Sequence, residues 1–134
     1  MNEVRYVSVF APGAAPERPP LVLLHGTGGR ETDLMPFAQG VAPNYPRLGL
    51  RGTVEIARGY AFFRRFPDRR VDEADLAGRV PALAAAISTL FRQNGVHRGA
   101  GAKVTRHIVP GGHDLTNEDA EITREWLESE SRLA

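Results

Sequence analysis

The sequence predicts a single α/β domain in which helices cover a short, mostly parallel sheet. The chain has 134 residues, which is the size of one ordinary domain. Residues 21–24, Leu-Val-Leu-Leu, are apolar at every position, as in a strand that is covered on both faces. Short strand patterns and helical patterns alternate along the rest of the chain, which is typical of an α/β sandwich.

The composition is that of a folded globular domain and argues against several classes of function. Hydrophobic residues make up 42% and charged residues 25% of the chain. The net charge is only +1, so no overall field favours nucleic acid or an anionic membrane as a partner. There is no cysteine, which excludes disulfides, thiolate metal sites and a cysteine nucleophile. The start of the chain lacks the apolar stretch of a secretory signal, and we expect a cytoplasmic protein without a membrane span.

The first half of the chain predicts three strands and one short helix. The strands are expected at 4–10, 21–24 and 53–57, and the helix over 33–39. Prolines and glycines make 11–20 a connecting loop, because proline lacks the N–H group that a sheet requires. Further breakers predict irregular chain before the third strand: Pro43, Asn44, Pro46 and Gly49.

A long helix is expected from Asp72, its predicted N-cap, to Asn94-Gly95. Its apolar face, which should pack on the sheet, consists of Leu76, Val80, Leu83, Ile87 and Leu90. Pro81 predicts a kink or a restart within it. The preceding segment, 58–72, mixes arginines with aromatic residues. A nucleic-acid patch is one interpretation, but the small net charge favours a loop packed over the sheet edge.

The C-terminal part predicts one more strand and one more helix. Residues 96–102 form a Gly-rich joint, and residues 103–109 are the expected fourth strand. The last helix should begin near Thr116 or Asn117, with Ile122 and Trp126 on its buried face.

The first motif with chemical content follows the apolar strand directly and consists of His25, Gly26, Thr27, Gly28 and Gly29. Glycines allow backbone N–H groups to converge on an anion. No Gly-Lys-Ser/Thr follows and the G-x-G-x-x-G spacing is incomplete, so a nucleotide-binding loop is not indicated. We expect an oxyanion and substrate-binding loop whose donors are the N–H groups of residues 27–29. A tight strand exit without a ligand is the alternative.

The second motif places His113 and Asp114 between the last strand and the last helix. The positive end of a helix dipole disfavours an imidazolium ion, which would keep His113 neutral and available as a general base. Asp114 and Asp119 are the candidate acids that could orient its ring, with Glu118 a further one. An exposed histidine without a function is the alternative.

Together, the two motifs resemble the α/β-hydrolase superfamily and, within it, the small bacterial carboxylesterase/phospholipase group. In that group a strand leads into a His-Gly-x-Gly-Gly loop, and an Asp follows at the position of Asp33. Segments 61–65, 72–75 and 101–104 also resemble the group. The resemblance implies a truncated α/β-hydrolase-like sandwich over residues 1–134, a small ester substrate, no cofactor, and His113 as the catalytic base.

The sequence departs from that group because it lacks a serine on a G-x-S-x-G elbow. The serines lie instead in a predicted strand, in the long helix and near the C-terminus: Ser8, Ser88, Ser129 and Ser131. The acid that orients the group's histidine is absent too, so an internal deletion with its joint near 96–102 is indicated. We therefore expect a weak or altered esterase-type hydrolase in which His113 activates water and the 25–29 loop receives the oxyanion.

Two other functions remain open at this stage. One is a catalytically inactive, hydrolase-derived binding or assembly module. The other is a metal-dependent enzyme. The candidate ligands would be His25, Asp33, His107, His113 and Asp114. Their spacing matches no recognised metal site, so no metal is expected.

Because residues 21–24 carry no charge and would form an open sheet edge, we also expect a homo-oligomer in which the C-terminal strand and helix are exchanged.

Overall fold

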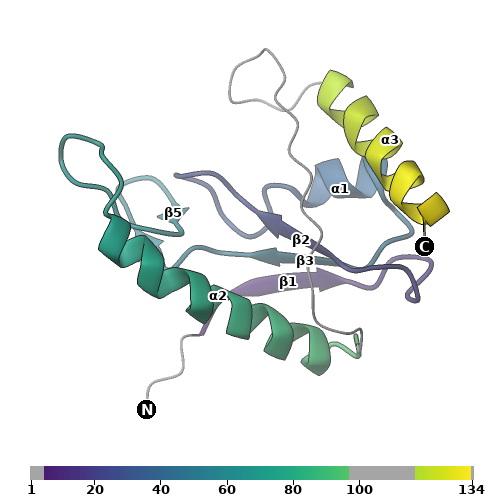
Figure 1. The fold of residues 1–134 in the computed structure, drawn as a ribbon, viewed down its shortest axis with the longest axis horizontal. Helices are drawn as coiled ribbons and strands as arrows, with labels where there is room; N and C mark the ends of the chain where they lie inside the picture. The colour runs from purple at the N-terminus through teal and green to yellow at the C-terminus, as the bar shows by residue number, and fades with distance from the viewer. Residues whose placement is uncertain (1–4, 97–116, 134) are drawn as a thin grey trace.

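The computed structural model describes residues 5–96 and 117–133. Its elements, labelled in Figure 1, are β1 (Ser8–Ala11), β2 (Leu21–Leu24), α1 (Met35–Val41), β3 (Arg47–Leu50), β4 (Val54–Glu55), β5 (Tyr60–Ala61), α2 (Glu73–Gln93) and α3 (Asn117–Leu133). The expected strand at 103–109 and most of the joint at 96–102 lie outside the described residues.

The main sheet has three strands in the order β1-β3-β2. The central strand β3 runs antiparallel to β1, with Ser8 opposite Leu50, and parallel to β2, with Leu24 opposite Leu50. Every residue of β3 is buried, and Leu48 and Leu50 are wholly inaccessible to solvent. The core of the domain is therefore built around β3.

The prediction of irregular chain over 43–49 is wrong, because β3 occupies 47–50. Pro46 lies just before the strand, and its carbonyl oxygen accepts a hydrogen bond from the N–H group of Leu21. Gly49 is needed within the strand, since a Cβ atom there would overlap the carbonyl oxygen of Glu31 and lie 3.1 Å from Val9 Cγ1. Residues that break strands in general are here required by close packing.

The side chain of Arg47 closes the turn between α1 and β3. Arg47 is only 5% exposed, and its Nη1 donates to the carbonyl oxygens of Ala42, Pro43 and Tyr45. Its Nη2 donates to the side-chain oxygen of Gln39 at 2.7 Å. A buried guanidinium group thus satisfies carbonyl groups at the C-terminal end of α1.

The expected third strand, 53–57, is shorter and does not join the main sheet. It is β4, which pairs only with β5 as an antiparallel hairpin, with Val54 opposite Ala61. The N-terminal strand is also shorter than expected and covers 8–11 rather than 4–10, while α1 begins two residues later than predicted.

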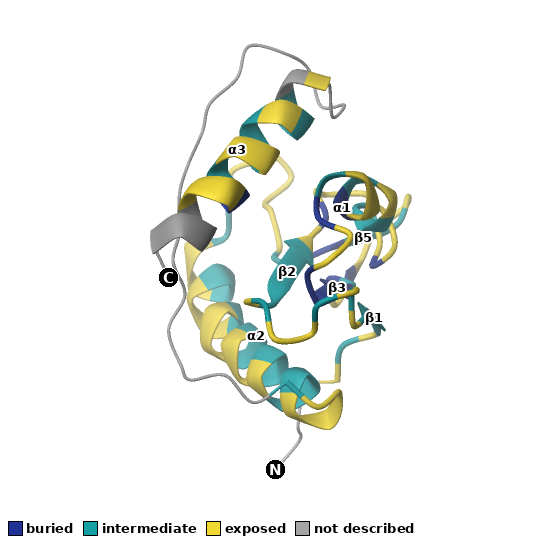
Figure 2. Ribbon diagram, turned by 90° about the vertical axis from the view of Figure 1, so that its right-hand side faces the viewer, coloured by how far each residue is buried: buried dark blue, intermediate teal, exposed yellow. Residues whose placement is uncertain are grey.

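Helices cover both faces of the sheet, as Figures 1 and 2 show: α1 lies over one face and α2 runs along the other. Helix α3 packs against α1, where Ala42, Tyr45 and Leu127 form a buried cluster and Trp126 packs against it. The predicted last helix is present: among the described residues α3 begins at Asn117, one of the two expected starts. Leu127, the most buried residue described in this helix, was not predicted.

Helix α2 has the predicted ends. The carboxylate of Asp72 accepts a hydrogen bond from the N–H group of Asp75 at 3.1 Å, and Gly95 follows the helix with φ +82°. A kink or a restart was predicted at Pro81, and of the two the restart does not occur, because the helix is continuous there. Pro81 has no N–H group to donate to the carbonyl oxygen of Ala77, one turn earlier. Both residues are exposed, so water can hydrogen-bond to this oxygen instead.

The packing of α2 is looser than predicted. None of its residues is fully buried, and Val80, expected on the sheet-facing side, is 57% exposed. The other apolar residues of that face are half-buried. By length and composition alone, α2 could cross a membrane, but a single helix of this kind is weak support for a membrane span.

Candidate active site

The 25–29 loop begins where β2 ends, at the carboxyl end of the parallel β2–β3 pair. Because β2 and β3 end side by side, with Leu24 opposite Leu50, residues that follow the two strands come together. Ligands of α/β sheets bind at this end of the strands. The structure therefore places the sequence motif where an α/β fold forms binding sites.

His25 fixes the start of this loop to the residues after β3. His25 is 7% exposed, and its Nε2 accepts a hydrogen bond from the N–H group of Gly52 at 2.9 Å. Nε2 must therefore carry a lone pair, so Nδ1 holds the proton and donates it to the carbonyl oxygen of Gly26 at 2.7 Å. The ring also packs on Phe62, with centroids 4.6 Å apart. Both nitrogens are occupied, which leaves His25 a structural part of the loop rather than a proton acceptor.

The backbone of Tyr60 holds the glycine end of the loop. The N–H group of Gly28 donates to the carbonyl oxygen of Tyr60 at 2.9 Å. The N–H group of Tyr60 donates to the carbonyl oxygen of Gly29 at 3.0 Å. Gly28 has φ +95°, a conformation that favours glycine, and a Cβ atom on Gly59 would overlap the carbonyl oxygen of Gly28. The loop is thus closed tightly against the chain that enters β5.

These contacts leave one of the three expected oxyanion donors open. Gly28 donates to Tyr60, and Gly29 donates to the carbonyl oxygen of Gly26 at 3.0 Å. Within the described part of the chain, the N–H group of Thr27 donates to no acceptor, and Thr27 is exposed. Of the three N–H groups, that of Thr27 is therefore the one without an acceptor among the described residues.

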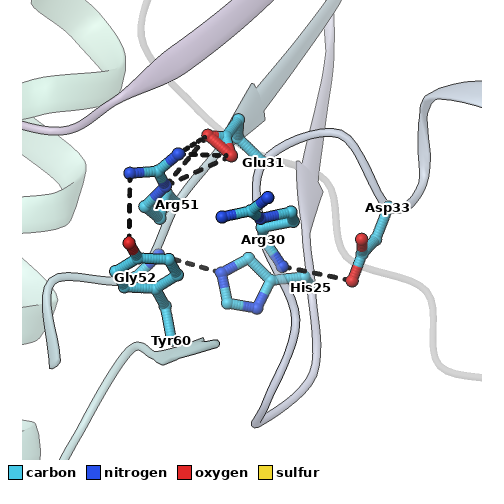
Figure 3. A network of polar contacts seen from close by, with 7 residues as sticks. All are labelled: His25, Arg30, Glu31, Asp33, Arg51, Gly52 and Tyr60. Atoms are coloured by element: carbon cyan, nitrogen blue, oxygen red, sulfur yellow. Dashed lines mark hydrogen bonds and ion pairs between the residues drawn. The ribbon is translucent and has the colours of Figure 1, made fainter. Parts of the chain in front are cut away.

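A second layer of polar contacts, shown in Figure 3, supports Tyr60 and was not predicted. Arg51 Nε and Nη2 donate to both carboxylate oxygens of Glu31 at distances of 2.9–3.2 Å, and the closest ion-pair distance is 2.7 Å. The Arg51 guanidinium carbon lies 4.5 Å from the centroid of the Tyr60 ring, a cation–π distance. Glu31, Arg51 and Tyr60 form a chain of contacts that we call the loop clamp.

Glu31 is a charged, structural member of this clamp. It is 8% exposed, and burial, the largest single influence, acts to raise its pKa. Hydrogen bonds from Arg51 and from its own backbone, together with the charges of Arg51 and Arg30, outweigh burial, so that the pKa falls below the ordinary value of 4.5. Hydrogen bonding to Glu31 likewise raises the pKa of Arg51. A carboxyl group that stays ionised at neutral pH cannot act as a general acid there.

The remaining predicted site residues are only partly described. His113, Asp114 and His107 lie outside residues 5–96 and 117–133, and so does any contact between His113 and the loop. Asp119 is half-buried in the first turn of α3, and its carbonyl oxygen accepts a hydrogen bond from Thr123 Oγ1 at 2.7 Å. Asp33 Oδ2 accepts from the N–H group of Arg30 at 3.1 Å. In the described part of the chain, no three potential metal ligands gather.

The serine residues that the structure describes have the contexts expected from the sequence. Ser8 lies in β1, and Ser88 is exposed within α2. Ser129 is exposed within α3. None of these three lies on a strand-to-helix turn, the position that presents a serine nucleophile in an elbow.

Comparisons with known proteins agree with this fold. No protein-family model matches the sequence. The protein called putative hydrolase MhqD from Bacillus subtilis (strain 168) is 37% identical over 79 residues, which are 59% of this chain and 40% of that protein. The solved Bacillus cereus carboxylesterase has a TM-score of 0.64 and 35% identity, over 69% of this chain and 44% of its own. The chain has an α/β-hydrolase-like fold, similar to that of these carboxylesterases. This confirms the resemblance inferred from the two motifs.

The α/β-hydrolase-like chain spans less than half the length of those two relatives. A carboxylesterase structure from Mesorhizobium loti matches differently, with a TM-score of 0.78 over 96% of this chain and 97% of its own. Its sequence identity is only 20%, so this likeness concerns the fold alone. A short α/β sandwich of this extent therefore also occurs in a solved structure.

Proposed function

We propose that the protein is an esterase-type hydrolase of low or altered activity that acts on small carboxylic esters. The likeness to a hydrolase and to carboxylesterases supports the class of reaction. The observation that carries the proposal to this chain is the geometry of the 25–29 loop. His25 and Tyr60 fix the loop, and the N–H group of Thr27 is left to receive an anion.

In the proposed reaction, His113 is the general base and water is the nucleophile. His113 takes a proton from water, and the water oxygen forms a bond to the carbonyl carbon of the ester. The carbonyl oxygen becomes an oxyanion, which accepts a hydrogen bond from the N–H group of Thr27. When the intermediate collapses, the bond to the alcohol oxygen breaks and the imidazolium returns the proton to that oxygen, which gives an acid and an alcohol. Asp114 or Asp119 would orient the ring of His113.

Hydrolysis of 4-nitrophenyl acetate tests this proposal. We expect His113→Ala to remove most of the rate above the uncatalysed background, because the variant has lost the base. Ser88→Ala is the matched control and should retain the rate, because Ser88 is exposed within α2. An equal loss in both variants, or no loss in the histidine variant, would contradict the assignment of His113.

A second candidate function is a hydrolase-derived module for self-assembly, and two observations favour it. Within the three-stranded sheet that the structure describes, β2 has a partner strand on one side only, and it carries no charged residue. Helix α2 has no fully buried residue although residues 80–91 contain no charge. Uncharged edges and apolar helix faces are usually covered in soluble proteins.

For this reason we propose that the protein forms a homodimer or larger assembly in which the C-terminal strand and helix are exchanged. Exchange would also allow His113 of one chain to reach the 25–29 loop of another. Sedimentation equilibrium at micromolar concentration should give a mass above that of one chain. A mass of 14.6 kDa that does not depend on concentration would rule this assembly out.

A further inference from the structure

Two guanidinium groups lie around the ring of Tyr60, next to the loop, but only one carboxylate accompanies them. The Arg51 guanidinium carbon lies 4.5 Å from the ring centroid, and that of Arg30 lies 5.9 Å from it. Figure 3 shows the side chain of Arg30 between His25 and the pair of Glu31 and Arg51. This cluster thus carries two positive charges and one negative charge.

The charge of Arg30 acts on Glu31 only at a distance, because Arg51 is the ion-pair partner of that carboxylate. Both carboxylate oxygens of Glu31 accept hydrogen bonds from Arg51, and the pair forms an ion pair at 2.7 Å. Asp33 binds only the backbone N–H group of Arg30, and its carboxylate lies on the far side of the loop from the Arg30 guanidinium (Figure 3). Among the described residues, no carboxylate lies within ion-pair distance of Arg30.

The backbone that carries Arg30 is held next to the proposed oxyanion loop. Arg30 follows Gly29 directly, and Gly29 is bonded through its carbonyl oxygen to the N–H group of Tyr60. The Arg30 guanidinium carbon in turn lies 5.9 Å from the centroid of the Tyr60 ring. Arg30 and Thr27 are both exposed and only three residues apart in the chain, so both are accessible to a ligand. A planar guanidinium binds a carboxylate through two parallel hydrogen bonds, which makes it a specific partner for that group.

We infer that Arg30 is a specificity-determining residue that binds a carboxylate of the substrate, so that the preferred substrates are esters carrying a free carboxylate group. The inference rests on the proposed esterase function, because the carbonyl of such an ester would lie at Thr27 while its carboxylate pairs with Arg30. Neutral esters of the same size would lack this second contact. The carboxylate would supply the negative charge that the cluster around Tyr60 lacks.

Two matched pairs of esters test the inference on the full chain. The mono-4-nitrophenyl ester of adipic acid is compared with 4-nitrophenyl hexanoate, and 4-acetoxybenzoate with its methyl ester, so that the carboxylate lies on the acyl side or the alcohol side. We expect the wild type to have a higher kcat/KM for the charged member of at least one pair. Arg30→Gln should lower that value about tenfold and leave the neutral member unchanged.

Arg92→Gln is the matched control, because Arg92 is an exposed arginine in the last turn of α2, away from the loop. It should keep the preference for charged esters. An equal kcat/KM for charged and neutral members in the wild type, or an unchanged preference in Arg30→Gln, would overturn the inference. Either result would leave the proposed esterase function standing as long as esters are hydrolysed.

A binding measurement separates failure of the inference from failure of the proposed function. If none of the esters is hydrolysed above background, the esterase proposal fails, and a titration with succinate followed by amide NMR then tests the Arg30 site alone. If succinate changes the amide chemical shifts of residues 26–30 in the wild type but not in Arg30→Gln, the result would support a carboxylate site there. Absence of such shifts in the wild type would overturn it.

Discussion

Replacing Gly59 by alanine is expected to lower the free energy of unfolding by about 3 kcal/mol, because strain and overlap combine at this position. Gly59 has φ +80°, which disfavours any side chain, and a Cβ atom there would overlap the carbonyl oxygen of Gly28 and lie 3.0 Å from that of Gly29. Both neighbours are backbone atoms of the loop, so the loop itself has to move. Urea unfolding followed by circular dichroism measures the change.

Gly95→Ala provides a matched control for this effect. Gly95 also has a positive φ, +82°, but a Cβ atom there would meet no atom of the described residues within 4 Å. It should therefore show only the conformational strain, about 1 kcal/mol. Equal losses in Gly59→Ala and Gly95→Ala would contradict the close contact between Gly59 and the loop.

Replacing Glu31 by glutamine is expected to lower the free energy of unfolding by about 2 kcal/mol near neutral pH, because several charge-assisted hydrogen bonds to Arg51 are lost. With Arg51 released, Tyr60 loses the cation that lies over its ring. The amide of Gly28, which donates to Tyr60, should then exchange its hydrogen faster. Asp75→Asn, which removes the 2.7 Å ion pair with Arg79 on α2, should leave the exchange of Gly28 unchanged.

The effect of Glu31→Gln should depend on pH in a definite direction. Because the folded pKa of Glu31 is lower than its ordinary value, the carboxylate stabilises the fold above the unfolded pKa, and this contribution is lost as the pH falls through the folded pKa. The difference between wild type and variant should therefore be full at about pH 7 and shrink as the pH falls below the ordinary value of 4.5. A difference that is constant over this range would show that the charge of Glu31 does not stabilise the loop clamp.

The sequence predicts most accurately those elements whose signals are local. The apolar run of β2, the Asp72 cap and the Gly95 end of α2 each depend on a few neighbouring residues, and all three occur as expected. Strand β3 was missed because Pro46 and Gly49 indicate a break locally. Their actual roles depend on distant contacts, with Leu21 and Glu31.

Because β3 was not predicted, the loop clamp could not be predicted either. Arg51 follows β3 directly, and only the parallel pairing of β3 with β2 brings it to Glu31, 20 residues earlier in the chain. The glycines of the 25–29 loop predicted N–H groups that converge. Which of these remain free depends on Tyr60, whose place opposite Gly29 no local pattern indicates. The exposure of Val80 was likewise unpredicted, since helical spacing identifies an apolar face but not what covers it.

The most direct test of the central claim, that hydrolysis proceeds by base-activated water without a serine nucleophile, is the intact mass of the protein after treatment with a fluorophosphonate probe. Such probes form a covalent bond with activated serines, and the serines that the structure describes lie in β1, in α2 and in α3 rather than on an elbow. The account predicts that the mass remains that of the unmodified chain. A single stoichiometric adduct on Ser88, or on any other serine, would contradict it.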